Sequence, residues 1–494
     1  MKRRGLIAAV GLLLAWGPPL GAQQRPDDQA RRLFEDGRAD IAAGRARQGL
    51  EALQTIVTGF STSSYADDAL LEIARYAEEV EKDTTKARDL YDQIAKKYPQ
   101  SDAAPGAYLQ MGRLALATAA SQSALDDALA NFQRVTRLYP ESPWVPHALV
   151  GAAQVYRRAG RFDAAIDAAR RAVLDHPGSE IAPEAQFEVG LGMAIGGDGM
   201  GAIEEFQRVL SQHPTSEAAA RALNATTALY RIYAAEKPLF LKDPGFQISA
   251  GDVLKDVRSL AVTPNGTLWI ASAKTKSAVS FDPSMKLGSS LPAEDPETLS
   301  VSPQGDIVFA SKLAVKIGRS GVLSFTMPSD KPGQPELIDR IGAATVLVSG
   351  DILVSDLKRK RVLRFKGSAF VSVFGDRSER EVEKLLTTSR GDVVMLRKDD
   401  KSIEILEESG RLISKIGPRG AGFEWKKPVD VAVDLFSNLY VADEEQGIFM
   451  LSPKNQLIAL FGAADVRKPR AITIDLSGSP LVYDDRAAAI VRFK

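Results

Sequence analysis

The chain has 494 residues, too many for one hydrophobic core, so the sequence predicts at least two domains. Hydrophobic residues make up 45% and charged residues 26%, a composition that excludes a disordered chain or a bundle of membrane helices. Lys plus Arg and Asp plus Glu both number 63, so no overall charge attracts nucleic acid or anionic lipid. The chain contains no Cys, which excludes disulfides, thiolate nucleophiles, Cys-ligated metals and a lipid-modified Cys anchor.

Residues 1–22 have the pattern of a secretory signal peptide. Lys2-Arg3-Arg4 provide the positive start, and an apolar run of about 12 residues follows, too short to remain as a membrane helix. Small residues end the segment, and we expect cleavage after Ala22. The mature protein is then periplasmic or secreted, with no transmembrane span.

A short phrase recurs through residues 23–236, at intervals of about 37–41 residues. Between its copies, apolar and small residues recur at steps of three and four, which predicts two amphipathic helices in each unit. The copies are Phe60-Ser61-Thr62-Ser63, Tyr98-Pro99-Gln100-Ser101, Tyr139-Pro140-Glu141-Ser142, His176-Pro177-Gly178-Ser179 and His213-Pro214-Thr215-Ser216.

The phrase is interpreted as structural punctuation rather than a binding motif. Pro cannot continue a helix, because it lacks the N–H group and collides with the preceding turn. Ser two residues later is expected to cap the first helix of the next unit. The sequence therefore predicts about five helical hairpins and a final capping helix over 217–235.

Within residues 149–177, small and apolar residues and a final proline stand at fixed steps: Leu149, Ala152, Ala153, Tyr156, Ala165, Ala172 and Pro177. With these residues at its consensus positions, the segment resembles a tetratricopeptide repeat. The following copy and the two preceding ones match more loosely, and the recurring phrase is similar to that of tetratricopeptide proteins of Gram-negative cell envelopes. This resemblance implies an α-solenoid over 23–236, with protein or peptide partners in an envelope complex at the periphery of the outer membrane.

After a linker at 237–245, the helical spacing gives way to strand alternation. Tight turns follow at steps of about 39–46 residues, as expected for one four-stranded blade per turn. Six turns predict a six-bladed β-propeller over 246–494, with 246–254 as the strand that closes the last blade. The turns are Asn265-Gly266, Gln304-Gly305, Ser349-Gly350, Arg390-Gly391, Ser437-Asn438 and Ser477-Gly478.

The second half resembles an NHL-type propeller. Residues 417–443 carry that family's glycine-rich lead-in and paired strands, and residues 354–365 match its later strands, with Arg361 at the usual Arg position. The fold class is thus multidomain: an α-solenoid followed by an all-β domain.

Catalytic chemistry is hard to assemble from these residues. The three His, at 147, 176 and 213, all lie in the helical half, so the propeller lacks both His and Cys. Ser-His-Asp and His-metal schemes are therefore excluded there. Acidic pairs such as Asp443-Glu444 and Asp484-Asp485 could hold Ca²⁺, but their spacing matches no dedicated calcium loop. We expect them to cap turns, and we expect no cofactor.

Six residues are candidates for partner binding. Four form a dense basic turn that could dock on an acidic surface, although a solvated loop is the simpler interpretation. Two are tryptophans near element boundaries, where an aromatic ring can anchor a partner or pack in the core. They are Lys358, Arg359, Lys360, Arg361, Trp144 and Trp425.

The sequence thus favours an exported, non-enzymatic scaffold, with the helical groove and a propeller face each binding a partner. One alternative is a hydrolase or lyase with a calcium-type metal in the propeller channel. Another is a ligand sensor or carbohydrate binder, which the 7% aromatic content makes less attractive.

Overall fold

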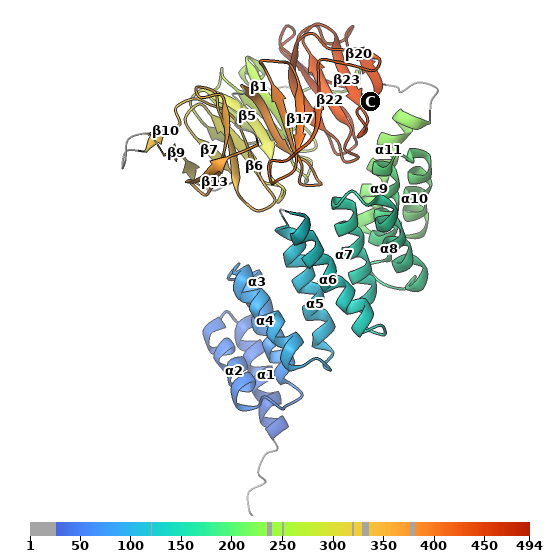
Figure 1. Cartoon of the computed structure of the whole chain (residues 1–494), viewed down its shortest axis with the longest axis vertical. Coiled ribbons are helices and arrows are strands. Elements are labelled where there is room, and N and C mark those ends of the chain that lie inside the picture. Colours follow the sequence, from blue (N-terminus) through green and yellow to red (C-terminus); the bar gives the residue numbers. More distant parts are fainter. Residues whose placement is uncertain are drawn as a thin grey trace, which may run out of the picture. The chain divides into compact units, whose positions relative to one another are not determined.

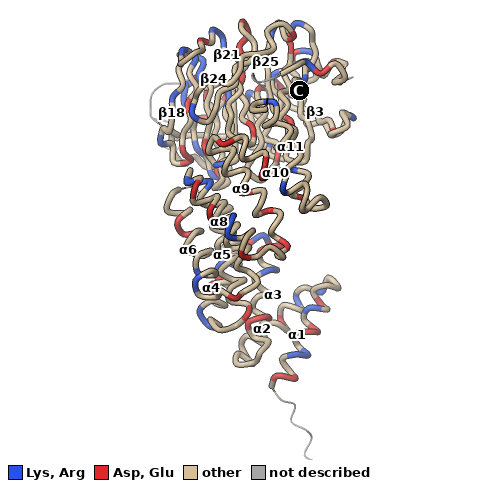
Figure 2. The backbone as a smooth tube through the Cα atoms, turned by 90° about the vertical axis from the view of Figure 1, so that its right-hand side faces the viewer, with Lys and Arg blue, Asp and Glu red and all other residues tan. Residues whose placement is uncertain are grey.

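The computed structural model describes residues 26–119, 121–234, 240–248, 251–318, 321–328, 335–375 and 381–494. The predicted signal peptide lies outside these residues. The chain forms two compact units, Met1–Ala107 and Tyr108–Lys494, and each is described by itself. In Figure 2, basic and acidic residues are interspersed along the helices and strands, in keeping with the balanced composition.

The described part of the helical half contains eleven helices, which confirms the predicted five hairpins and final helix (Figure 1). None of the helices in the described residues has the length and apolar content needed to cross a bilayer. The helices are α1 (Pro26–Ala42), α2 (Ala46–Gly59), α3 (Ala66–Glu79), α4 (Thr84–Lys97), α5 (Ala103–Ala117), α6 (Gln122–Leu138), α7 (Val145–Arg158), α8 (Phe162–Asp175), α9 (Ala182–Gly196), α10 (Gly199–Gln212) and α11 (Glu217–Tyr233).

Small residues let neighbouring helices pack closely. Phe132 of α6 is buried between Gly112 of α5 and Gly151 of α7, and a Cβ atom on either glycine would collide with its ring. Gly190 of α9 stands in the same relation to Phe206 of α10. These positions fix the ring-into-glycine packing that holds α5–α7 and α9–α10 together.

The repeated phrase ends helices as predicted, but its serine rarely caps the next one. Among the described copies, only Ser216 accepts a hydrogen bond at the N-cap position, from the Ala219 amide. The hydroxyls of Ser142 and Ser179 instead accept from the amide two residues later, at 3.3–3.4 Å, and their helices begin one residue after that amide. The predicted capping was therefore wrong in these copies: the serine closes the connecting turn rather than the helix.

The C-terminal half is a six-bladed β-propeller (Figure 1), as predicted. Each blade is an antiparallel sheet in chain order, and two short ribbons, β9–β10 (Thr326–Met327, Glu336–Leu337) and β19–β20 (Arg419–Gly420, Phe423–Glu424), lie between blades. The blades are β1–β4 (Val257–Val262, Leu268–Ser272, Ser277–Phe281, Leu287–Pro292), β5–β8 (Pro296–Val301, Ile307–Ser311, Val315–Ile317, Val322–Leu323), β11–β14 (Ile341–Val346, Ile352–Asp356, Arg361–Lys366, Ala369–Val373), β15–β18 (Val382–Thr387, Val393–Arg397, Ile403–Leu406, Leu412–Ile416), β21–β24 (Pro428–Val433, Leu439–Asp443, Gly447–Leu451, Leu457–Phe461) and β25–β27 (Pro469–Ile474, Pro480–Asp484, Ala489–Arg492).

The first strands of the blades form a closed ring around the channel, with β1 beside both β5 and β25. All six predicted turns connect a first strand to a second strand, and each has a residue with positive φ. Consecutive turns in an antiparallel blade lie at opposite ends of the strands. These six turns therefore share one face of the propeller, and the turns between second and third strands share the other.

The last blade is closed by residues 241–243 and not, as predicted, by 246–254, of which the structure describes 246–248 outside any strand and 251–254 as a short 3₁₀ helix. Leu241 and Lys494 exchange backbone hydrogen bonds, and the Asp243 amide donates to the carbonyl of Arg492. The buried Asp243 carboxylate also accepts from Lys494 and Arg492, which holds its pKa below the usual range. Part of the predicted linker is thus the closing segment, and its ion pairs fix the register.

Candidate functional site

The basic turn connects β12 to β13, and most of its charge is already paired. Lys358 lies 3.2 Å from Asp339, and Arg359 pairs with Asp356 at 2.7 Å and with Glu336. Lys360 is exposed and has a φ of +53°, whereas Arg361 is half-buried. Of the four candidate residues, Lys360 is therefore the most available to a partner.

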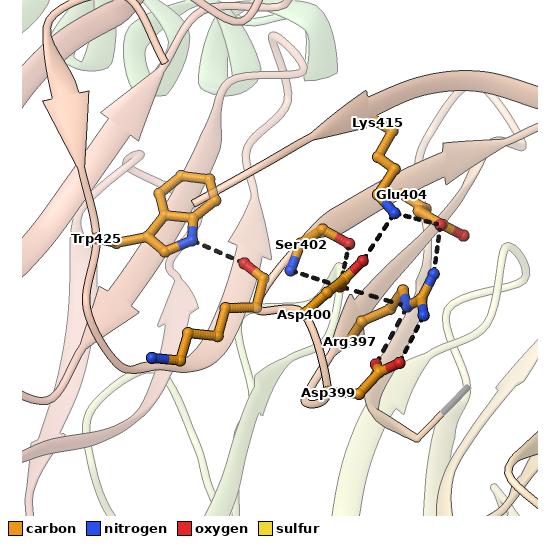
Figure 3. A network of polar contacts seen from close by, with 8 residues as sticks. Arg397, Asp399, Asp400, Ser402, Glu404, Lys415 and Trp425 are labelled. Carbon is orange, nitrogen blue, oxygen red and sulfur yellow. Dashed lines mark hydrogen bonds and ion pairs between the residues drawn. The ribbon is translucent and has the colours of Figure 1, made fainter. Parts of the chain in front are cut away.

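The two candidate tryptophans differ in exposure. Trp144 precedes α7 and is half-buried, with its ring 5.4 Å from that of His147. Trp425 is 1% exposed, stacks on Phe423, and donates from its indole nitrogen to the carbonyl of Lys401 (Figure 3). Because a buried ring offers no surface to a partner, Trp425 is reassigned to the core.

The acidic pairs considered as cation ligands behave mainly as turn caps. Asp443 accepts four backbone amides, from Lys426, Lys427, Glu445 and Gln446. Asp484 accepts three, from residues 467, 468 and 486. Both carboxylates end the second strand of a blade, so the predicted capping role is confirmed at these two positions.

Asp399 and Asp400 belong to an ionic network on the blade β15–β18 (Figure 3). The nearly buried Arg397 pairs with Asp399 at 2.6 Å and with the buried Glu404 at 3.1 Å. Lys415 bridges Asp400 and Glu404 from the neighbouring strand β18. The network fastens three strands of one blade, which is a structural role.

The channel of the propeller contains a buried ion pair. Nζ of Lys384, on β15, lies 3.1 Å from the Asp430 carboxylate of β21 and donates to the hydroxyl of Ser259, on β1, at 3.0 Å. The amide of Ile472 also donates to Asp430. One ammonium group therefore ties together three first strands, and the carboxylate that faces the channel already has a cation.

The turns on one face of the propeller contact the C-terminal helices of the same unit. Arg158 of α7 donates to the carbonyl of Arg390, and Arg231 of α11 donates to that of Ser477. Phe436, in the β21–β22 turn, is 3% exposed and belongs to the apolar cluster of α9–α11. These contacts define a docked interface between helices and propeller within the second unit.

This interface contains a half-open cavity of about 600 Å³, the volume range of small-ligand sites. Its helical wall comes from α7, α9 and α11, and its propeller wall from the ends of β1, β5, β15, β21 and β25. We name it the docking cavity. The polar side chains that line it include Arg157, Glu188, Arg221, Asn224, Thr263, Ser300, Lys384, Thr387, Thr388, Ser389, Asp434 and Asp475.

Asp434 is the most perturbed carboxyl group of the docking cavity. Burial raises its pKa to about 6, although hydrogen bonds from Asn438, Phe436 and Tyr440 favour the charged form and limit the rise. The group sits two residues before Phe436. Its ionisation is thus coupled to the turn that docks on the helices.

A separate acidic cluster lies in the first unit. Carboxylate oxygens of Asp67, Asp68 and Asp102 lie within 4.8 Å of one another. Burial and the two neighbouring carboxylates raise the pKa of Asp68. These oxygens are ligands of the type that hard cations take, but clustered acidic groups are common on surfaces without an ion.

The docking cavity was not predicted from the sequence. Its residues come from helices and blades whose positions in the chain lie up to about 300 residues apart, and no motif connects them. One signal was present: the β21–β22 turn contains Leu435-Phe436, whereas the other five turns are polar or contain Gly at their tips. A large apolar ring at the tip of a hairpin indicates a surface that another element covers.

Comparison with protein families supports the helical assignment. Tetratricopeptide repeat models match residues 68–101 and 114–185, within a helical half that forms a tetratricopeptide-like array. The chain is also 30% identical over 159 residues to the outer membrane protein assembly factor BamD of Pasteurella multocida, a match that covers 29% of this chain. It spans 59% of the length of that relative.

Solved structures similar to this chain include propellers matched at low identity. One is a streptogramin B lyase, 14% identical with a TM-score of 0.38, covering 52% of this chain and 97% of the other. A virginiamycin B lyase from Staphylococcus aureus is 15% identical over 51% of this chain and 85% of its own, also at 0.38. The WD40 propeller domain of Doa1 is 11% identical over 52% and 97%, at 0.38.

Proposed function

We propose that this protein is an exported, non-enzymatic scaffold of the bacterial cell envelope. One observation carries the proposal: the repeats dock a folded protein surface, that of their own propeller. Phe436 packs in the apolar cluster of α9–α11 as an interface residue of a partner would. Tetratricopeptide helices of this chain thus act as a protein-binding surface.

The channel supports a structural rather than catalytic propeller. Lys384 occupies the position beside Asp430 that a metal-dependent reaction would need for its cation. The propeller also lacks His, the usual side chain for proton transfer near neutral pH. Both features favour the scaffold over the hydrolase or lyase alternative.

The docked interface restricts where a partner can bind. One propeller face is covered by helices, so the face with the turns between second and third strands is the accessible one. That face carries the basic turn with the exposed Lys360. At the other end of the sequence, α1 exposes the charged side chains of Arg31, Arg32, Glu35 and Asp36. We assign partner binding to these two surfaces.

The likeness to an outer membrane assembly factor supports a place in the envelope. We infer that the mature chain begins at Gln23 and acts in the periplasm, as a component of a larger envelope complex. Mass spectrometry of the protein purified from the periplasmic fraction tests this directly. An N-terminus at Met1 in the cytoplasmic fraction would contradict it.

Site-specific photo-crosslinking in cells tests the scaffold proposal. A crosslinking residue placed at Glu35 or at Lys360 is expected to capture a defined envelope protein. The matched control is Gln54, an exposed position of the neighbouring helix α2. Crosslinks that are absent at both positions, or equal at the control, would refute the assignment of these surfaces. Turnover of an ester or lactone by the purified chain would refute the non-enzymatic role.

A further inference from the structure

The docking cavity has two walls of different chemistry. On the helical wall, Arg221, Asn224, Ala225 and Ala228 lie at steps of three and four along α11 and so share one face of that helix. The propeller wall is largely apolar at the channel mouth. Its apolar residues include Leu260, Leu299, Leu386, Val431, Ile472 and Leu476.

The helical wall has hydrogen-bond donors to spare. The side-chain amide of Asn224 is half-buried and makes no hydrogen bond within the part of the chain that the structure describes. Arg221 uses one amino group on Glu184 while its guanidinium lies 4.3 Å from the Phe187 ring centroid. Arg157 uses Nε and Nη2 on Glu188, so among the described residues its Nη1 amino group is left over. A ligand that carries a hydrogen-bond acceptor would pair with these donor groups.

The acceptors of the cavity, by contrast, are occupied. Asp434 takes four hydrogen bonds from its own turn and from Tyr440. Asp475 takes three, all on Oδ1, from residues 477 and 479 of its turn, and its Oδ2 lies 4.0 Å from Nη1 of Arg492. Glu188 takes those of Arg157 and Gln154. A ligand that brought only donors would have to compete with these groups for the carboxylate oxygens.

The charges around the cavity determine whether a neutral or an ionised ligand fits. The lining contains three cationic side chains, Arg157, Arg221 and Lys384, and three carboxylates. Just behind it, Glu184 and Asp430 pair with Arg221 and Lys384. Among the lining residues that the structure describes, there is therefore no excess positive charge to offset the desolvation of an anion. Each lining carboxylate already has hydrogen-bond donors or a cation beside it, which a cationic ligand would have to displace.

We propose that the docking cavity is a binding site for a small neutral amphipathic molecule, with an apolar body and one or two amide or ester carbonyl groups. The carbonyl oxygen accepts from Asn224 and Arg221, and the apolar body lies against the propeller wall. The volume of about 600 Å³ admits a small molecule or a few residues of chain, but not a folded domain.

Three ligands that share the leucine side chain and differ in charge test the proposal on the full chain. They are N-acetyl-leucinamide, which is neutral, N-acetyl-leucine, an anion, and leucinamide, a cation. We expect saturable one-to-one binding of the neutral compound by calorimetry at about pH 6.5, where the α-amino group of leucinamide is almost fully protonated. The anion and the cation are each expected to bind at least about tenfold more weakly, because neither can be paired in the site. Equal affinities, or no saturation of the neutral compound up to about 10 mM, would overturn the proposal.

Two substitutions locate the site. Asn224→Leu keeps the branched shape of the side chain but removes the amide, and we expect the neutral ligand to bind about tenfold more weakly. Asn224→Asp should shift the preference toward leucinamide, a change that a loss of folding would not produce. Thr227→Ala, exposed on α11 and outside the lining, is the matched control and should bind as the wild type does. Unchanged binding in Asn224→Leu would place the ligand elsewhere and refute the assignment.

Discussion

Ionisation of Asp434 should make the propeller less stable as pH rises, and Asp434→Asn should remove that effect. The carboxyl group is almost fully buried, and its pKa rises from 3.8 to about 6 on folding. Because the folded pKa lies above the unfolded one, the folded state binds the proton more tightly, and stability falls between about pH 4 and pH 6. A shift of about two units corresponds to roughly 3 kcal/mol over the whole range.

Between pH 5 and pH 7.5 the same two pKa values give a loss of about 1.4 kcal/mol of unfolding free energy. The amide introduced by Asp434→Asn would mimic the protonated carboxyl, since its oxygen can still accept from the backbone amides of Phe436 and Asn438. Chemical denaturation of the full chain at both pH values, with the propeller transition followed by near-ultraviolet circular dichroism, measures the difference. Asp475→Asn, in the corresponding turn of the next blade, controls for replacing a turn carboxylate. If the unfolding free energies of Asp434→Asn and the wild type changed equally with pH, the conclusion that burial raises the pKa of Asp434 would be wrong.

Three further substitutions test the packing. Phe436→Ala should cost about 3 kcal/mol and increase hydrogen exchange in α9–α11, because it empties a buried site in their cluster; exchange that rose only in the propeller would contradict docking. Gly478→Ala should destabilise the same interface by about 1–3 kcal/mol, because the φ of Gly478 is +70° and a Cβ atom there would collide with Ala228. A lower melting temperature would show this loss. Arg397→Met should lower the melting temperature by removing the guanidinium group that pairs with the buried Glu404 at 3.1 Å, at a cost of about 2–4 kcal/mol; an unchanged melt would show that the network is not stabilising.

The element order followed from local signals in the sequence, because those signals act within a few residues. Pro99 and Pro140 end helices by their own covalent structure, and Gly266 or Gly391 reverses the chain because its φ is positive. Each of these effects needs no knowledge of the rest of the fold. That is why the number of hairpins and blades could be predicted.

Pairings that depend on competition between segments were harder to predict. Residues 246–254 alternate well and were expected to close the propeller, yet 241–243 do so. The deciding contacts are the pairs that Asp243 makes with Arg492 and Lys494 at the far end of the domain. Likewise, Ser142 could cap a helix or a turn, and the geometry of the connection selects the turn. Such outcomes depend on three-dimensional partners that a single sequence does not name.

The candidate site was the least predictable part, because it is made by docking and not by a motif. Its helical wall would be an ordinary solvent-exposed groove in the absence of the propeller, and its propeller wall an ordinary channel mouth. Only their contact leaves Asn224 half-buried without a hydrogen bond to the described residues and places Phe436 among helices. The candidates predicted from the sequence, the basic turn and the tryptophans, all lie outside the cavity lining.

Docking and ligand binding in this protein must also be linked thermodynamically. A molecule that contacts Asn224 on one wall and Leu299 on the other binds only when helices and propeller are in contact. Its binding therefore stabilises the contact between helices and propeller, and that contact strengthens its binding by the same free energy. At about a hundred times its dissociation constant this amounts to about 2.7 kcal/mol, comparable to the expected cost of Phe436→Ala. A saturating ligand should thus offset much of the loosening that this substitution causes, whereas a ligand bound elsewhere would leave the interface as loose as before.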